Sequence, residues 1–399
     1  TAPRLAHELS RRPRTLEAVL DPMFLAPLPS DADYRASARV ALEPAQSMEG
    51  LLDRARSFGQ EQFFRVGLRL LSASLSADEA GAAYSGLAAG LIGALLTACE
   101  QQLARQVGKI AGGRVVVVAM GKLGGREMAA SSDLDLILIY DTDEGVSETD
   151  GAKPISAAQY FTRLTQRLVS ALSVPTAEGR LYEVDMRLRP SGQKGPVATR
   201  LTAFSEYQNS SAQIWEKMAL TRARVVAGSA SLGAQVEPEI EKALCARRSA
   251  PDTAHDVTEM RNRIEKEKGT PDIWQIKQVR GGLVDIEFII QYLQLIHGAD
   301  HRDILSTNTG QALNRLAKAG LIEAGPAQDL RDALVLYQTL TQLLRLCLAP
   351  PCDPTGATVG LKRRLASAAG LPDFAILEAE LRTAQAKIHQ HFKRIVEAA

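Results

Sequence analysis

Two β-type runs determine the fold class of a chain whose other patterns are mostly helical. The run VVVVAM lies within residues 114–122, and DLDLILIY spans residues 133–140. Continuous apolar runs of this length, rich in β-branched residues, are typical of buried strands. Most other apolar residues recur at helical spacing. We therefore predict an α+β, predominantly helical fold in which a small mixed sheet is flanked by N- and C-terminal helical regions.

The order of these patterns divides the 399 residues into three predicted domains. Residues 1–110, with segments such as LEAVL and FFRVGLRLLSASL, are expected to form an N-terminal helical region. Residues 111–232 contain the two runs and a third predicted strand, LYEVDMRLRP at residues 181–190, and form a predicted catalytic core. Residues 233–399 are expected to form a helical bundle without a sheet. Helical spacing already resumes near residue 200 and includes IWEKMALTRARVV.

Composition excludes several classes of protein. The formal net charge of +1 gives no electrostatic support for binding to nucleic acid or to a membrane. The longest apolar stretch, residues 86–99, is too short to span a bilayer and is predicted to be a buried helix. The four cysteines show no metal-binding spacing, which indicates free thiols in a reducing, cytoplasmic setting. The chain starts at Thr1, which suggests a piece of a longer protein.

Two carboxylates stand at the entry to the second run. Side chains alternate between the faces of a strand, so Asp133 and Asp135 are expected on one face and Leu134 and Leu136 on the other. Adjacent carboxylates repel each other unless a cation lies between them. Hard oxygen ligands suit Mg²⁺, which often accompanies nucleotide phosphates. The alternative is a turn or strand cap, although Asp is depleted in strands.

The third predicted strand carries further charge. Alternation places Glu183, Asp185, Arg187 and Arg189 on one face. Asp185 could complete a three-carboxylate cage around two metal ions, as in an in-line displacement. Arg187 and Arg189 could then hold phosphate oxygens through bidentate donors. The alternative is an edge strand whose charged face meets solvent.

The segment GKLGGREM contributes Gly121, Gly124 and Gly125 between the first two strands. Glycine allows the backbone to approach a phosphate closely, and Lys122 could add positive charge. The segment lacks the defining residues of the dinucleotide-binding and P-loop motifs. A tight turn from strand to helix is the alternative for each glycine.

Four separated motifs together resemble one family. VAMGKLGGREM with SSDLDLILIYD, LYEVDMRLRPSGQKGPVAT, WEKMALTRARVVAG and KQVRGGLVDIEFIIQYL are similar to the glutamine synthetase adenylyltransferase/adenylyl-removing enzymes. These enzymes belong to the DNA polymerase β-like nucleotidyltransferases. The resemblance implies that Asp133, Asp135 and Asp185 are metal ligands, and that Ser132 and the Gly124-Gly125 backbone hold the triphosphate of ATP. It also implies three partners: glutamine synthetase, the PII signalling protein and the other half of the same polypeptide.

Enzymes of this family have two halves that act in opposite directions. RLRPSG, LYEVD and GGLVDIEF resemble the half that transfers AMP, whereas Ser131 and Gln213 are closer to the half that removes it. We predict Mg²⁺-dependent transfer of AMP from ATP to a tyrosine hydroxyl of glutamine synthetase, with release of pyrophosphate. One alternative is phosphorolytic removal of AMP, with release of ADP. The other is an inactive regulatory module that binds glutamine synthetase or PII, against which the complete set of acids argues.

Overall fold

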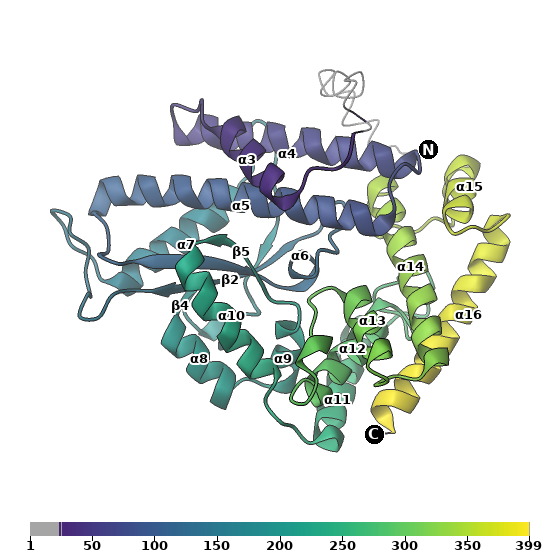
Figure 1. Ribbon diagram of the computed structural model, residues 1–399. Coiled ribbons are helices and arrows are strands. Elements are labelled where there is room, and N and C mark those ends of the chain that lie inside the picture. Colours follow the sequence, from purple (N-terminus) through teal and green to yellow (C-terminus); the bar gives the residue numbers. More distant parts are fainter. Residues whose placement is uncertain (1–23, 25, 399) are drawn as a thin grey trace.

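The computed structural model describes residue 24 and residues 26–398 of the chain. It confirms the predicted α+β, predominantly helical class, with a five-stranded mixed sheet among helices (Figure 1). The strands are β1 (Arg114–Ala119), β2 (Leu134–Asp141), β3 (Val184–Asp185), β4 (Ala198–Arg200) and β5 (Arg224–Gly228).

The strand order brings acidic residues from different segments to the same end of the sheet. β1 pairs antiparallel with β2 on one side and with β5 on the other. β3 and β4 both pair parallel with the free edge of β2, one after the other along its length. In this register Asp135 lies directly opposite Asp185. Adjacent strands are about 5 Å apart, so the two carboxylates are neighbours although 50 residues separate them in the sequence.

Helices precede, interrupt and follow the sheet. The N-terminal helices are α3 (Asp31–Leu42), α4 (Met48–Leu71) and α5 (Ala77–Val107). Within the core lie α6 (Gly121–Gly124), α7 (Ala157–Ser173), η3 (Gly192–Lys194), α8 (Leu201–Ser210) and α9 (Ile214–Leu220). After β5 come α10 (Ala230–Leu244), α11 (Ala250–Lys268), α12 (Leu283–His297), η4 (Arg302–Ile304), α13 (Thr309–Lys318), α14 (Ala324–Cys347), α15 (Val359–Ala368), α16 (Phe374–Phe392) and η5 (Lys393–Glu397).

These helices agree with the predictions at both ends of the chain. The N-terminal region is helical as predicted over its described part, whereas the LEAVL segment lies outside the described residues. No strand occurs between β5 and residue 398, which confirms the expected absence of a sheet in the described C-terminal part. The buried apolar side chains form one continuous core across these regions. The division into three domains stays a prediction.

Helix α5 contains the apolar stretch that was predicted to be buried. It is the one described helix that is long and apolar enough to cross a membrane by length and composition, yet 72% of its most apolar window is buried inside the structure. The helix packs against α3, α4, α7 and β5. Gly90 permits close approach of α3, since a Cβ there would lie 2.7 Å from the carbonyl oxygen of Tyr34. The burial of α5 is therefore explained by its position in the protein core.

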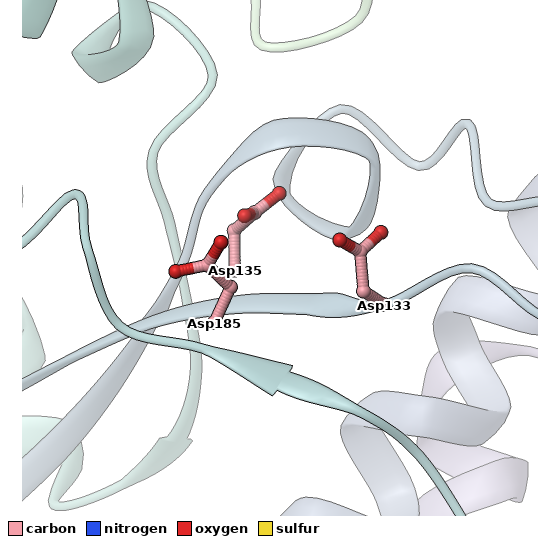
Figure 2. A group of neighbouring side chains, drawn as sticks. All are labelled: Asp133, Asp135 and Asp185. Atoms are coloured by element: carbon pink, nitrogen blue, oxygen red, sulfur yellow. The ribbon is translucent and has the colours of Figure 1, made fainter.

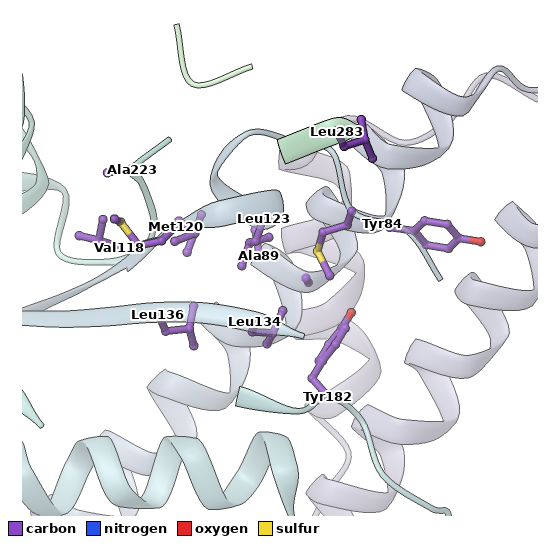
Figure 3. Close-up of a cluster of buried hydrophobic side chains, with 14 of the residues drawn as sticks. Tyr84, Ala89, Val118, Met120, Leu123, Leu134, Leu136, Tyr182, Ala223 and Leu283 are labelled. Carbon is purple, nitrogen blue, oxygen red and sulfur yellow. The ribbon is translucent and has the colours of Figure 1, made fainter. Parts of the chain in front are cut away.

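A hydrophobic cluster packs against the entry to β2. Figure 3 shows Leu134 and Leu136 of β2 together with Leu123 of α6, Tyr84 of α5 and Leu283 of α12. All five side chains are buried. The alternation predicted for residues 133–136 is thus confirmed on its apolar side, and the carboxylates take the opposite face.

Two predicted segments differ from the structure. The third strand was predicted over residues 181–190 but comprises only Val184–Asp185. The Asp185 carboxylate accepts a hydrogen bond from the Arg187 backbone N–H at 2.8 Å, and this local bond turns the chain away from the sheet. The helix predicted through IWEKMALTRARVV ends at Leu220, and the residues that follow form β5. Val225 and Val226 are β-branched and lie beside the open edge of β1, so strand pairing prevails there.

Candidate active site

Three aspartates converge at the end of the sheet. Asp133 lies in the turn before β2, Asp135 is on β2 and Asp185 is on β3. One carboxylate oxygen from each lies within 4.8 Å of those of the other two, and Figure 2 shows the side chains gathered beside the loop that follows β1. We call these three residues the acid cluster. Sequence alternation and sheet register together account for its geometry.

The electrostatics of the acid cluster differ from residue to residue. Burial, together with the charges of Asp133 and Asp185, raises the pKa of Asp135 to about 6. Burial also acts to raise the pKa of Asp185, but the hydrogen bonds and positive charge of Arg187 outweigh it and lower that pKa below its ordinary value. Repulsion among crowded carboxylates is relieved by a cation. The oxygen donors of the cluster are of the type that Mg²⁺ prefers, so the residues fit the ion that the family implies.

The absence of a side chain at Gly121 leaves space for the Asp135 carboxylate. The φ of Gly121 is +52°, and a Cβ at this position would overlap the carboxylate of Asp135. The left-handed conformation and the close approach both favour glycine. Gly121 therefore lies against the acid cluster, and its contact with a phosphate stays a prediction.

Unlike Gly121, Gly124 and Gly125 pack inside the protein, away from the acid cluster. Their N–H groups donate to the carbonyl oxygens of Met120 and Gly121, which closes the turn of α6. A Cβ on Gly124 would overlap the carbonyl oxygen of Arg222. These two glycines allow close packing inside the protein, and their amides are already engaged, so we do not propose them as triphosphate ligands.

Ser132, Arg187 and Arg189 fall into three environments. Ser132 is buried, and its hydroxyl oxygen accepts a hydrogen bond from the Ala129 N–H at 2.9 Å. Arg187 is exposed and its Nε donates to Asp185 at 2.7 Å, which places its guanidinium at the rim of the acid cluster. Arg189 is buried, and it donates to backbone carbonyl oxygens of the loop at residues 186–196. The expectation that Arg187 and Arg189 share one strand face is wrong, because the strand ends at Asp185.

A buried ionic network behind the site was not predicted. The Arg222 guanidinium contacts Glu127, in the loop after α6, and also contacts Glu287 of α12 at 2.7 Å. Glu127 in turn accepts hydrogen bonds from the N–H and hydroxyl of Thr309. The network ties the loop after β1 to the C-terminal helices. Arg222 and Glu287 each belong to one of the four motifs that resemble the family. The sequence did not predict their contact, because 65 positions separate them.

The charge on Asp135 is expected to destabilise the metal-free protein. The pKa of Asp135 is about 6 in the folded protein, against an ordinary value of 3.8. Between these two pH values the folded state binds more protons than the unfolded state, so the free energy of unfolding falls as pH rises from about 4 to about 6. Asp135→Asn removes this loss and should raise the free energy of unfolding at pH 7 by up to about 3 kcal/mol. Urea unfolding in EDTA measures the gain, which should disappear below about pH 4.

The control for this experiment is the neighbouring exposed acid Glu183, which pairs with Arg180 and lies outside the acid cluster. Glu183→Gln should show no pH-dependent gain. Added Mg²⁺ should stabilise the unsubstituted chain more than Asp135→Asn. Equal stability of the chain and of Asp135→Asn at pH 7 in EDTA would contradict the raised pKa of Asp135.

Comparisons with known proteins identify the family of the chain. The profile of the family described as glutamate-ammonia ligase adenylyltransferase matches residues 1–239. A second profile, described as GlnD PII-uridylyltransferase, matches residues 254–396. The first match ends within α10 and the second begins within α11.

Several relatives carry the name bifunctional glutamine synthetase adenylyltransferase/adenylyl-removing enzyme. The protein from Xanthobacter autotrophicus is 47% identical over 399 residues, which are 100% of this chain and 40% of the relative. Those from Rhodopseudomonas palustris and Bradyrhizobium diazoefficiens are 45% and 43% identical over 99% of the chain, and again 40% of each relative is covered. The chain thus spans about two fifths of the length of these relatives.

Proposed function

Because the chain belongs to the glutamate-ammonia ligase adenylyltransferase family, we propose that it transfers AMP from ATP to a tyrosine hydroxyl of glutamine synthetase. The observation that carries this proposal is the acid cluster, whose three carboxylates converge from β2, β3 and the preceding turn. A cluster of this kind suits phosphoryl-group chemistry, where positioning and charge neutralisation supply most of the rate.

The proposed roles follow from the positions of the side chains. Asp133, Asp135 and Asp185 would hold two Mg²⁺ ions, in the arrangement described above for in-line displacement. Bound Mg²⁺ supplies charge neutralisation at the reacting phosphate. The tyrosine oxygen forms a bond to the α-phosphorus while the bond from that phosphorus to the bridging oxygen breaks. The electron pair leaves with pyrophosphate, and the hydroxyl proton passes to a carboxylate of the acid cluster. Arg187, at the rim, is placed to meet phosphate oxygens.

The second candidate is removal of AMP by phosphorolysis, favoured by Ser131 and Gln213. By the resemblance, transferase halves carry glycine at the position of Ser131. Ser131 has a φ of +59°, the left-handed conformation that glycine adopts readily, so this position would accept glycine. Gln213 is exposed at the N-terminus of α9, on the protein surface. Neither residue belongs to the acid cluster. The longer motif runs therefore remain the stronger support for transfer.

The regulatory alternative receives support of a different kind. The match of residues 254–396 to a PII-uridylyltransferase profile favours PII as a partner of the C-terminal helices. The other half of the same polypeptide is a second proposed partner, because the relatives are longer than this chain. A purely regulatory role does not require three crowded carboxylates, which cost folding stability.

The direction of the reaction is tested with two substrates. The chain is incubated with unmodified glutamine synthetase, Mg²⁺ and ATP labelled at the α-phosphate, and then with adenylylated glutamine synthetase and inorganic phosphate. We expect label on a tyrosine in the first reaction and little ADP in the second. Asp133→Asn serves as the inactive control in both.

The reverse pattern, with rapid ADP release and no labelling from ATP, would show that the chain removes AMP, as Ser131 and Gln213 indicate. Absence of both reactions, with PII or glutamine synthetase still bound, would favour the regulatory module. Each outcome thus selects one of the three functions.

A further inference from the structure

The third residue of the acid cluster, Asp185, has little support from the sheet itself. Strand β3 is only two residues long, and these residues pair with Leu134 and Asp135 of β2. The preceding residue adds one hydrogen bond, from the Leu134 N–H to the Glu183 carbonyl oxygen at 2.8 Å. After Asp185 the chain turns away from the sheet. The position of this carboxylate therefore depends on the segment that leads into β3.

That segment, residues 174–183, lies along one face of helix α4. We call it the approach segment. Four residues of α4 contact it, namely Arg56, Gly59, Gln60 and Phe63. The last three follow the first by three, four and seven residues, which places all four on one face of the helix. A single stripe of an N-terminal helix thus accompanies the chain toward the acid cluster.

Arg56 and Gln60 hold the first part of the approach segment. The Arg56 side chain is buried, and its guanidinium donates to the carbonyl oxygens of Gly179 at 2.8 Å and of Val174. Val174 caps the C-terminus of α7, where the partial negative charge of the helix favours a cation. The Gln60 amide donates to the Glu178 carbonyl oxygen at 2.8 Å. These bonds attach the backbone of the segment to α4 at both ends of its turn.

Gly59 and Phe63 hold the last part of the approach segment. A Cβ at Gly59 would lie 2.8 Å from Cδ1 of Leu181, so the glycine lets this side chain approach the helix closely. The ring of Phe63 packs edge-on against Tyr182, with the ring centroids 5.7 Å apart. Leu181 and Tyr182 are both buried, and Tyr182 belongs to the hydrophobic cluster in Figure 3. Contact with α4 therefore continues to within three residues of Asp185.

We propose that α4 positions Asp185 for metal binding and that Arg56 is the positioning residue of this helix face. The inference rests on the proposed function, in which Asp185 is one of three metal ligands. Arg56 holds the backbone before β3, and the register of β3 then places the carboxylate beside Asp135. Replacing a group that orients a metal ligand without touching the metal typically changes metal affinity by about 10- to 100-fold. The N-terminal helices thereby act on the metal site through the backbone.

Metal binding measures this role apart from turnover. Mn²⁺, which suits carboxylate ligands as Mg²⁺ does, is titrated into the chain, Arg56→Met and Gln60→Ala, and the free ion is followed by electron paramagnetic resonance. We expect about 10-fold weaker binding in Arg56→Met and about 3-fold weaker binding in Gln60→Ala, which removes one hydrogen bond. Arg69→Met is the matched control, because Arg69 is a buried arginine of α4 that donates to Ala26, outside the approach segment. Its Mn²⁺ affinity should stay within about 2-fold of that of the unsubstituted chain.

A double substitution separates positioning from a general loss of stability. In the Asp185→Asn background, Arg56→Met should change Mn²⁺ affinity by less than about 2-fold, because the ligand through which Arg56 acts is gone. A purely structural role would weaken binding equally in both backgrounds. Hydrogen exchange of the amides at residues 176–183 should be faster in Arg56→Met than in Arg69→Met, since only Arg56 holds this part of the backbone.

Equal weakening in the two backgrounds overturns the inference. It is also overturned by Mn²⁺ affinity within 2-fold of the unsubstituted chain in both Arg56→Met and Gln60→Ala, or by absence of Mn²⁺ binding to the unsubstituted chain. If Arg56→Met does not fold, Gln60→Ala and its combination with Asp185→Asn decide by the same criteria. Arg56-dependent Mn²⁺ binding in a chain that transfers no AMP to glutamine synthetase keeps the positioning role and removes the proposed function.

Discussion

Asp133→Asn is expected to abolish AMP transfer while the fold is retained. Asp133 is exposed and contributes one of the three converging carboxylates, so its amide replacement removes a proposed metal ligand without opening a cavity. Loss of such a ligand removes several kcal/mol of transition-state stabilisation, which corresponds to a rate loss of roughly 10³-fold or more. Single-turnover transfer of labelled AMP to glutamine synthetase at saturating Mg²⁺ measures the effect. Asp185→Asn should be as damaging.

Glu183→Gln is the matched control for these variants. Glu183 stands two residues before Asp185 but pairs with Arg180, and it is absent from the acid cluster. Its rate should stay within about 2-fold of the unsubstituted chain, since a surface ion pair contributes little. Near-normal turnover of Asp133→Asn would refute the metal-site assignment. Normal turnover of Asp185→Asn alone would reduce the site to a single metal with two carboxylates.

Arg222→Met is expected to produce the largest loss of stability among the variants considered. Arg222 is 5% exposed, and its guanidinium contacts Glu127 and Glu287. Methionine preserves much of the apolar volume but leaves two carboxylates without their cation. Breaking a buried ion pair on one side costs about 3–5 kcal/mol. Urea unfolding followed by circular dichroism should show the loss.

A second variant separates lost charge from lost packing. Arg222→Met combined with Glu127→Gln and Glu287→Gln carries no uncompensated carboxylate, so it should recover part of the stability. Arg180→Met, which removes an exposed cation, should change stability by less than about 0.5 kcal/mol. If the triple variant were no more stable than Arg222→Met, packing rather than charge would explain the loss.

The Arg222 network also bears on the nucleotide site. Glu127 lies five residues after Lys122, and Glu287 is on α12, which follows Lys277 by a few residues. By contacting both carboxylates, Arg222 links the segment after α6 to α12. The buried network thus connects stability of the fold with geometry of the site.

The sequence by itself determined the features that follow from the short repeat of apolar residues along strands and helices. Two-residue alternation fixed Asp133 and Asp135 on the face opposite Leu134 and Leu136, since every strand side chain reverses direction. Helical spacing likewise predicted the described C-terminal helices. The third acid, Asp185, was also predicted, although the strand proposed to carry it proved to be two residues long.

Only the tertiary structure decided which distant segments meet. A hydrogen bond from Arg187 to Asp185 ends β3 and separates Arg187 from Arg189, an outcome that strand alternation does not contain. The pairing of β5 with β1 overrode a helical pattern, because an open strand edge must be paired or covered. The Arg222 network joins residues from 65 to 182 positions apart. Such contacts depend on how the chain folds in three dimensions, and a local sequence pattern carries no record of them.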